Sequence, residues 1–504
     1  MHKNKPKNRF TVDLLAGYLS QGYAILISII AVPLQYKIIG PEGFGLVGLL
    51  TVIQIWFFLL DLGKTAFLTR ESAQYLASPN HAIHFYQLFY KVQKWIIAMA
   101  ILGALGIFFF AEILAINWIS AQLLNTQKIT DCIRLIGGIV AFRMISEIYR
   151  GVLLGQGRIV WLSGFNSISI TLRNFLALPF ILAMGAHNSE TIFFKFQLFI
   201  SIVECIVLYG TSHHHLKRPL QIATELQPPL SSQQFAWQMW IAALIWVLVS
   251  QLDKILLTGF FSLETFGTFS LILILANGIS LIVAPFNTII PVRLTSLGGI
   301  DSKDGFLFYR TATRWVSISV SVIAAVLAFH PHEILFLWTG NSKLAQQGSI
   351  LLRCYVLGNA IMAISSFPYY LQFSKGRLNL HLKGSVIYIL LLIPAMIYFI
   401  STSGMNGAGI AWLIINTVYA ILWTPIVHRQ YSNHLHSIWL FFDVLPPLFG
   451  AIIGSIFFSA LEPPEDKIYL AAWIFGATII AFIFSFFSSY VATKYGPHKY
   501  KYKA

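Results

Sequence analysis

Apolar stretches of about twenty residues, separated by short polar breaks, recur along the whole chain. A helix of that length spans the ~30 Å hydrocarbon core of a bilayer. The composition agrees, because 57% of the 504 residues are apolar and only 11% are charged, whereas soluble domains average ~45–50% and ~25%. We therefore expect a polytopic membrane protein, and we assign the formal net charge of +15 to membrane topology and not to nucleic-acid binding.

The spacing of these stretches predicts an all-α membrane protein with about fourteen transmembrane helices. Helices satisfy their own backbone hydrogen bonds in lipid, and the period-two alternation typical of transmembrane strands is absent. The predicted helices lie at residues 11–38, 44–68, 91–115, 129–154, 159–184, 191–211, 235–260, 265–290, 309–329, 344–371, 380–400, 405–427, 437–459 and 468–493.

Basic residues are distributed unequally over the predicted loops. If the chain starts in the cytoplasm, seventeen Lys and Arg residues fall in cytoplasmic segments, and three, Lys128, Lys343 and Lys467, fall in outer segments. Cytoplasmic loops of membrane proteins collect Lys and Arg, so we expect both termini on the cytoplasmic side. The basic start leads into an apolar run too long for a signal peptide, so we expect that run to remain as the first helix.

Two pairs of short segments indicate an internal duplication. "GPEGFGLVGLL" at 40–50 resembles "SLETFGTFSLI" at 262–272 with an offset of 222 residues. "LLGQGRIVWLSG" at 153–164 resembles "FSKGRLNLHLKG" at 373–384, and the Gly-Arg pairs at 157–158 and 376–377 align with an offset of 219. We expect two six-helix lobes in parallel pseudo-repeat, with a substrate path between them. The expected parts are an N-terminal lobe at 1–212, a cytoplasmic linker at 213–234, a C-terminal lobe at 235–427, and two additional helices with a basic cytoplasmic tail at 428–504.

Several charged residues lie inside the apolar stretches, where desolvating a charge costs several kcal/mol. Arg143, Glu147 and Arg150 form one stripe at i, i+4 and i+7 on the fourth predicted helix. The others are Asp61, Lys64, Arg173, Glu204, Asp253, Lys254 and Arg353.

Two interpretations of these charges stay open. Ion pairs between helices, or side chains that reach the membrane surface, explain the bases near cytoplasmic ends, which are Lys64, Arg70, Arg150, Arg310 and Arg314. Arg173 and Arg353 lie deeper and have no acid within four residues on their own helix. For these two we favour a water-filled cationic cavity, and guanidinium groups suit phosphate especially well.

Motifs of enzymes are absent from the sequence. It contains no P-loop, no HExxH and no G-x-S-x-G, and the predicted outer loops are short. The three cysteines lie in apolar segments without metal-like spacing, and we interpret the tract of three histidines at 213–215 as a solvated loop. We therefore expect no catalytic residues, no metal and no cofactor.

The stretches "YKIIGPEGFGLVGLLTVIQIWFFLLDLGKTAFLTRESA" (36–73) and "YRGVLLGQGRIVWLSGFNSI" (149–168) resemble a known family. They are similar to the Wzx-type O-antigen flippases, which are polysaccharide exporters of the MOP superfamily. The resemblance implies a flippase for a polyprenyl-diphosphate-linked oligosaccharide in a bacterial inner membrane, working by alternating access. The implied partners are this lipid-linked oligosaccharide and the bilayer, with a polysaccharide polymerase and chain-length proteins as candidates and no nucleic acid.

The cost of charges in the membrane suggests roles for the charged residues of the apolar stretches, and the resemblance implies that Asp61, Arg70 and Glu71 lie at the inner mouth of the cavity. Arg143, Arg173, Lys254 and Arg353 are candidates for a cationic, substrate-binding cavity. The candidates for a gate or for coupling are Asp61, Lys64, Arg70, Glu71, Glu147, Glu204 and Asp253. A structural cap is the competing explanation for Asp61. The rival functions are a MATE-like, cation-coupled exporter of small molecules and a membrane-bound polysaccharide polymerase or ligase.

Overall fold

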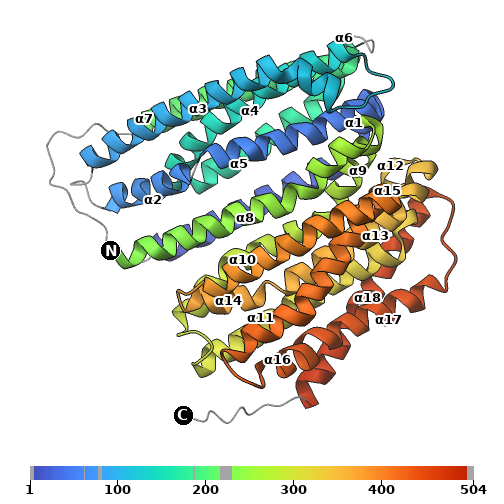
Figure 1. Cartoon of the computed structure of the whole chain (residues 1–504). Coiled ribbons are helices and arrows are strands. Elements are labelled where there is room, and N and C mark those ends of the chain that lie inside the picture. The colour runs from blue at the N-terminus through green and yellow to red at the C-terminus, as the bar shows by residue number, and fades with distance from the viewer. Residues whose placement is uncertain (1–4, 62, 78–81, 185–187, 216–229, 496–504) are drawn as a thin grey trace. The chain divides into compact units, whose positions relative to one another are not determined.

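The computed structural model describes residues 5–61, 63–77, 82–184, 188–215 and 230–495. Helices make up almost all of these residues (Figure 1). Within the described ranges, the strand-type pairing is limited to one isolated bridge between Ser120 and Ser262. The predicted all-α class is confirmed.

The helices of the first part of the chain follow the predicted stretches closely. They are α1 (Lys5–Leu60), α2 (Lys64–Ala77), α3 (Ala82–Asn117), α4 (Thr126–Gly155), α5 (Ile159–Thr171), the π-helix η2 (Leu172–Leu176), α6 (Ala177–Met184) and α7 (Ser189–His215).

The second part of the chain contains more short helices. They are α8 (Leu230–Phe260), α9 (Leu263–Ala276), α10 (Gly278–Ser296), α11 (Lys303–Phe329), α12 (Pro331–Thr339), α13 (Ser342–Ile364), α14 (Phe367–Ser374), α15 (Asn379–Arg429), α16 (Leu435–Ile438), the π-helix η4 (Trp439–Val444), α17 (Leu445–Ser459) and α18 (Lys467–Tyr495).

Ten helical stretches in the described part of the chain are long and apolar enough to cross a membrane. Two of them, Leu15–Leu60 and Asn379–Arg429, contain 46 and 51 residues, more than twice the ~20 that one crossing needs. Each covers two of the predicted helices. The protein is therefore a multi-pass membrane protein, and the number of fourteen crossings stays a prediction.

Both long stretches bend at a glycine. Gly40 has φ 73° and ψ 169° within α1, and Gly404 has φ 61° and ψ −145° within α15. Residues eight apart in a continuous helix are separated by ~12 Å. The rings of Tyr36 and Phe44 are nevertheless 5.6 Å apart, so the chain changes direction between them.

Three predicted helices end or break earlier than expected. The helix predicted at 44–68 ends at Leu60, because Gly63 adopts a positive φ of 73° and α2 begins anew at Lys64. The helix predicted at 265–290 is divided at Asn277 between α9 and α10. The one predicted at 344–371 is divided between α13 and α14, where Pro368 begins a new helical turn.

The chain forms two compact units. Unit 1 consists of residues 1–229 and 254–271, and unit 2 consists of residues 230–253 and 272–504. Helices α8 and α9 are each shared between the units. The lobe boundaries expected from the sequence stay a prediction, and residues 216–229 of the expected linker lie outside the described part of the chain.

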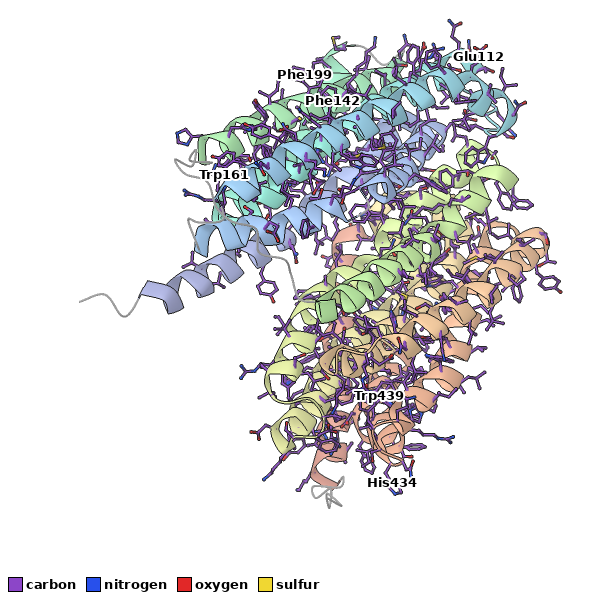
Figure 2. The ribbon with its side chains drawn as sticks, turned by 60° about the vertical axis from the view of Figure 1, so that its left-hand side comes forward. Glu112, Phe142, Trp161, Phe199, His434 and Trp439 are labelled. Carbon is purple, nitrogen blue, oxygen red and sulfur yellow. The ribbon has the colours of Figure 1, made fainter. Side chains whose placement is uncertain are left out.

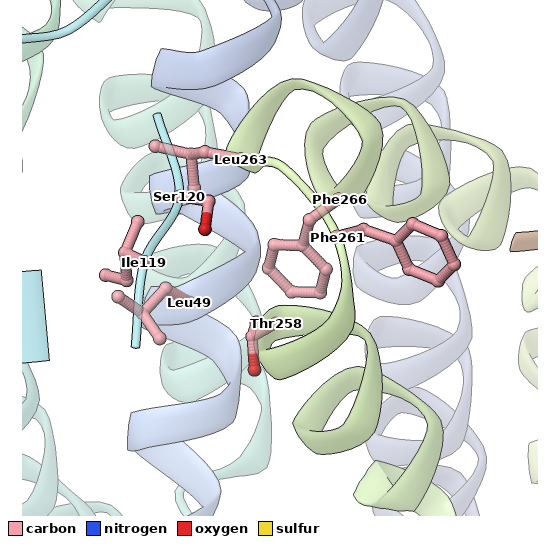
Figure 3. Close-up of a pocket in the computed structure, with 7 residues that line it drawn as sticks. All are labelled: Leu49, Ile119, Ser120, Thr258, Phe261, Leu263 and Phe266. Carbon is pink, nitrogen blue, oxygen red and sulfur yellow. The ribbon is translucent and has the colours of Figure 1, made fainter. Parts of the chain in front are cut away.

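In unit 1, glycines let α9 approach α1 closely. A Cβ atom at Gly45 would overlap the carbonyl oxygen of Leu263, and one at Gly48 would overlap the hydroxyl of Ser270. Figure 3 shows Leu263 and Phe266 beside Leu49 of α1, around a small apolar pocket. The pocket volume of about 10 Å³ is at the limit for a single water molecule, so the pocket is a packing gap.

In unit 2, the last two helices pack tightly against each other. Gly450 and Gly454 are four residues apart on α17, and a Cβ at Gly450 would overlap the carbonyl oxygen of Phe484 on α18. This is the small-residue spacing that allows membrane helices to approach closely. Ala451 and Ala481 join the buried cluster on α11, so the additional helices form part of unit 2.

Large apolar side chains remain exposed on both units. Phe109 is 72% exposed, Leu182 is 66% exposed and Phe457 is 63% exposed. Figure 2 shows side chains projecting from the helices, including Trp161 and Phe199 on unit 1. Apolar exposure on this scale fits a surface that contacts lipid.

The two predicted repeat segments around Gly157 and Gly376 have the same local structure. The φ angles of these residues are 67° and 66°. The N–H of Gly157 donates to Leu154 O, and the next N–H, of Arg158, donates to Leu153 O. The N–H groups of Gly376 and Arg377 bond in the same pattern to Phe373 and Gln372. Both are Schellman helix ends, and they support the duplication.

Candidate functional site

A cluster of charged side chains lies on α4 in unit 1. Arg143, Glu147 and Arg150 occur on this helix at the predicted spacing. Their hydrogen-bond partners on other helices come from α1, α5 and α7, and Gln197 of α7 also links the cluster to Arg173 of η2. The cluster therefore joins five helices of unit 1 at one place.

Arg143 is held by neutral amide groups. Its Nη1 donates to Gln54 Oε1 at 2.7 Å, and its Nη2 donates to Gln197 Oε1 at 3.1 Å. The Nε atom of Arg143 is buried without a hydrogen-bond partner. The nearby charge acting on Arg143 is the like charge of Arg150. The positive charge of Arg143 is therefore uncompensated by a direct carboxylate partner.

Arg173 has a carboxylate partner on another helix. Its Nη2 forms an ion pair with Glu204 Oε2 of α7, and the Glu204 side chain is only 4% exposed. The backbone oxygen of Arg173 accepts a hydrogen bond from Gln197 Nε2 at 2.8 Å. Gln197 thus bonds to both arginines, and the absence of an acid on the same helix did not leave Arg173 unpaired.

The π-helix η2 carries Arg173. Pro179 lies four residues after Phe175, and a proline removes a backbone donor and crowds the carbonyl four residues earlier. A wider π-turn just before the proline accommodates this defect, and such turns often occur at functional sites. Pro179 was therefore a sequence signal for an irregular turn near Arg173.

Glu147 pairs with Arg150 and not with Arg143. Arg150 Nε lies 3.4 Å from Glu147 Oε1, and Arg150 Nη1 also donates to Asn166 Oδ1 of α5. The Glu147 side chain is 57% exposed, so this part of the cluster is open to solvent. Glu147 does lie between two bases along α4, as predicted from the spacing. Of these two bases, Arg150 forms the ion pair with it.

The cluster contains three arginines and two glutamates, which leaves one net positive charge. The amides of Gln54, Gln197 and Asn166 complete it, although the pattern of charges in the sequence does not point to them. Isolated amides within apolar stretches were the available signal, because a buried amide needs hydrogen-bond partners. The arrangement can bind an anion through guanidinium groups while the amides hold those groups in place.

Asp61 caps helix α2. Its carboxylate accepts hydrogen bonds from the backbone N–H of Thr65 at 3.1 Å and from the Thr65 hydroxyl at 2.8 Å. Burial raises the pKa of the Asp61 carboxyl, and the hydrogen bonds from Thr65 lower it in part. The geometry therefore supports the structural explanation for Asp61.

The other candidates near Asp61 in the sequence lie on α2. Lys64 Nζ lies 3.4 Å from the centroid of the Trp95 ring, a cation–π contact between α2 and α3. Glu71 is half-buried on α2. The side chain of Arg70 lies outside the part of the chain that the structure describes.

The remaining candidates lie on α8 and α13. Asp253 is buried and accepts a hydrogen bond from Tyr355 Oη at 2.7 Å. Lys254 is half-buried. Arg353 is exposed, and its Nε donates to the carbonyl oxygen of Ala328 at 2.8 Å. Ala328 is in the last turn of α11, where carbonyl groups lack helical partners.

A second charge cluster in unit 2 is structural. Arg310 Nε and Nη2 donate to the two oxygens of Asp443 at 2.9 and 3.0 Å, and Arg314 Nε donates to Asp443 Oδ1 at 2.6 Å. Asp443 is fully buried. Of the two interpretations given for Arg310 and Arg314, an ion pair between helices is correct. Asp443 was not among the expected partners.

Residues 13–294, more than half of the chain, match the profile of the family described as "Polysaccharide biosynthesis protein". No curated protein sequence matches the chain.

Solved membrane transporters have a similar fold. "Lipid II flippase MurJ, inward closed conformation" matches with a TM-score of 0.66 and 13% identity, covering 95% of this chain and 100% of that one. A multidrug resistance MATE family transporter of the MOP superfamily in an inward-facing conformation matches with a TM-score of 0.64 and 11% identity, and the match covers 84% of this chain and 97% of that one. The MATE multidrug transporter DinF-BH matches with a TM-score of 0.57 and 14% identity, and the match covers 85% of this chain and 97% of that one. At these identities the likeness shows the fold.

Proposed function

Because the chain belongs to the polysaccharide biosynthesis protein family and has the fold of MOP-superfamily transporters, we propose that it is a flippase for polyprenyl-diphosphate-linked oligosaccharides. The substrate is an O-antigen, capsule or exopolysaccharide repeat unit, and the protein moves it across the bacterial inner membrane by alternating access. The protein acts as a transporter and not as an enzyme. Its termini are cytoplasmic, and a polymerase and chain-length proteins use the product.

The observation that carries this proposal is the amide-held guanidinium of Arg143. It retains its full charge because Gln54 and Gln197 are neutral. A diphosphate supplies the acceptor oxygens and negative charge that such a group lacks. Arg173 is the second ligand, and the diphosphate competes with Glu204 for it. Lys254 and Arg353 are further candidate ligands.

The remaining acids have coupling roles in this proposal. Glu204 loses its partner when the diphosphate engages Arg173, and an unpaired buried carboxylate is strongly unfavourable. Glu147 and Arg150 form the solvent-accessible edge of the cluster. Asp61, Lys64, Arg70, Glu71 and Asp253 remain gate candidates, although the contacts of Asp61 favour a cap. A MATE-like cation exporter would need a mainly anionic site, and the net charge of this cluster is positive.

Binding of a bare polyprenyl diphosphate to the purified protein tests the proposal. Arg143→Gln should weaken this binding by about tenfold to a hundredfold, because a charge-assisted hydrogen bond contributes ~1.5–3 kcal/mol. Arg143→Lys should retain part of the affinity. The matched control is Arg134→Gln on the same helix, since Arg134 pairs with Asp131 on the surface.

Export in cells lacking other flippases provides the second measurement. Arg173→Glu should abolish glycan export, because it places two acids opposite each other at residues 173 and 204. Membrane insertion should be unaffected. Full export by both Arg143→Gln and Arg173→Ala would remove the cluster from the mechanism. Stronger binding of an organic cation than of the diphosphate would favour the MATE-like alternative.

A further inference from the structure

Unit 2 contains a cavity of about 510 Å³ that the charge cluster of unit 1 does not use. Its walls come from α8, α10, the junction of α13 and α14, and α15 (Figure 1). Pockets for small ligands have volumes of ~300–1,000 Å³. The cavity is therefore large enough to hold part of a substrate.

No Asp, Glu, Lys or Arg occurs among the described residues that line this cavity. The polar lining consists of neutral amides, hydroxyls and one histidine, such as Asn287, Asn416, Ser366, Thr424 and His381. A charged ligand group buried here would have no ionic partner, which is costly. The lining therefore excludes phosphate and carboxylate groups and favours an uncharged polar ligand.

Aromatic side chains form one side of the cavity. Tyr419 and Trp423 are four residues apart on α15, and their rings stack with centroids 6.2 Å apart. Tyr388 meets Tyr419 edge to face at 5.4 Å. Gly384 makes room for this arrangement, because a Cβ there would overlap the Trp423 indole. Tyrosine and tryptophan combine a large apolar face with a polar edge, which matches the C–H faces and hydroxyl groups of a pyranose ring.

Polar atoms in this wall lack protein partners. Thr424 is 1% exposed, and its Oγ1 has no hydrogen-bond partner. The Nε1 donor of Trp423 is also buried without one. Both atoms lie beneath the cavity surface, so they show that this wall is polar but do not themselves contact a ligand. The amide of Asn287 is exposed in the lining. It can bond to sugar hydroxyl or acetamido groups, whereas an isoprenoid chain would leave it unsatisfied.

We propose that this cavity binds an uncharged pyranose sugar of the transported oligosaccharide. The inference rests on the proposed flippase function, and it adds that the sugar recognised by unit 2 carries hydroxyl or acetamido groups and no acid. Trp423 and Tyr419 provide the stacking surface. Asn287 provides a polar contact at its edge.

Binding to the purified full-length protein tests the inference with three polyprenyl diphosphates. One carries no sugar, one carries a neutral N-acetylhexosamine disaccharide, and one carries a disaccharide that contains a hexuronic acid. The neutral disaccharide should strengthen binding about tenfold over the bare lipid, and the acidic one should not. Trp423→Leu, which removes the stacking surface, and Asn287→Leu, which removes the polar contact, should each remove most of this gain while leaving the affinity for the bare lipid unchanged.

The matched control is Trp315→Leu on α11, an exposed tryptophan outside the cavity lining, which should keep the full gain. An unchanged gain in both cavity variants, or an equal gain from the acidic disaccharide, would overturn the inference. The unfolding temperature of each variant confirms that it is folded.

A separate arm uses the free neutral disaccharide at millimolar concentration. It should raise the unfolding temperature of the wild-type protein and of Arg143→Gln, but not that of the two cavity variants. If the bare lipid does not bind while this sugar effect persists, the flippase proposal fails and the sugar cavity stands. If the free sugar has no effect on the wild type and the neutral lipid-linked disaccharide shows no gain, the cavity inference fails.

Discussion

At the scale of single residues, the buried charges of this protein are defined by the partners that lie across helix boundaries. Arg173 pairs with Glu204, and Asp443 pairs with both Arg310 and Arg314. Arg143 differs, since its direct partners are amides. A paired charge primarily positions helices, whereas a charge held by neutral groups remains available for a ligand.

Removing Asp443 should destabilise the protein strongly. Asp443→Asn leaves two arginines without their shared acid, and breaking a buried ion pair in this way costs ~3–5 kcal/mol. The free energy of unfolding in detergent measures the loss. Asp301→Asn is the control, because Asp301 is 61% exposed and pairs with Lys375 at the surface, where such pairs contribute ~0–1 kcal/mol. Equal effects of the two substitutions would show that the Asp443 cluster is not structural.

The two roles suggested for Asp61 predict different outcomes. As a cap of α2, Asp61→Ala should cost ~0.5–2 kcal/mol of stability, and Asp61→Asn should restore most of it, because an amide oxygen also accepts from Thr65. Glycan export should then survive in Asp61→Asn. If a stably folded Asp61→Asn protein loses export, the negative charge of Asp61 is needed for transport, and the gate role is favoured over the cap.

At the scale of elements, prolines and glycines explain where the helices deviate from a regular path. Both described π-helices precede prolines: η2 lies before Pro179, and η4 lies before Pro446 and Pro447. Each carries one residue of a buried ion pair, Arg173 or Asp443. A wider turn rotates the following residues relative to a regular helix, so an ideal helical wheel misplaces side chains beyond it.

The helix ends at Gly157 and Gly376 should respond alike to substitution. Alanine at either position should cost about 1–2 kcal/mol, because both have a positive φ that a Cβ disfavours, while no atom lies within 4 Å of the added Cβ. Gly106→Ala, in open space within regular helix α3, should be neutral or stabilising. Unfolding temperatures provide the measurement. A large effect at only one of the two ends would argue against their equivalence.

At the scale of the whole molecule, the Lys and Arg distribution predicts how the chain is oriented in the membrane. Reporter fusions at described loops test that orientation. A fusion after Arg429 should report the cytoplasm, and one after Glu462 should report the outer side, since one apolar helix separates the two positions. Signals on the same side of the membrane would contradict the predicted topology. The reverse assignment would place both termini outside.

The amino-acid sequence alone was enough to predict the all-α membrane class, the family resemblance and the location of the long apolar helices. These features depend on local apolar length and on short motifs, which are readable along the chain. The short helix α12 was not predicted, and the Schellman geometry at Gly157 and Gly376 emerged only from the backbone.

Only the tertiary structure decided which charges are paired. Arg173 and Glu204 are far apart in sequence, as are Arg310 and Asp443, and a search limited to neighbours on one helix cannot find such pairs. The tertiary structure also shows that Glu147 pairs with Arg150 and not with Arg143. The neutral cavity of unit 2 arises in the same way, because its aromatic and polar lining converges from four separate parts of the chain.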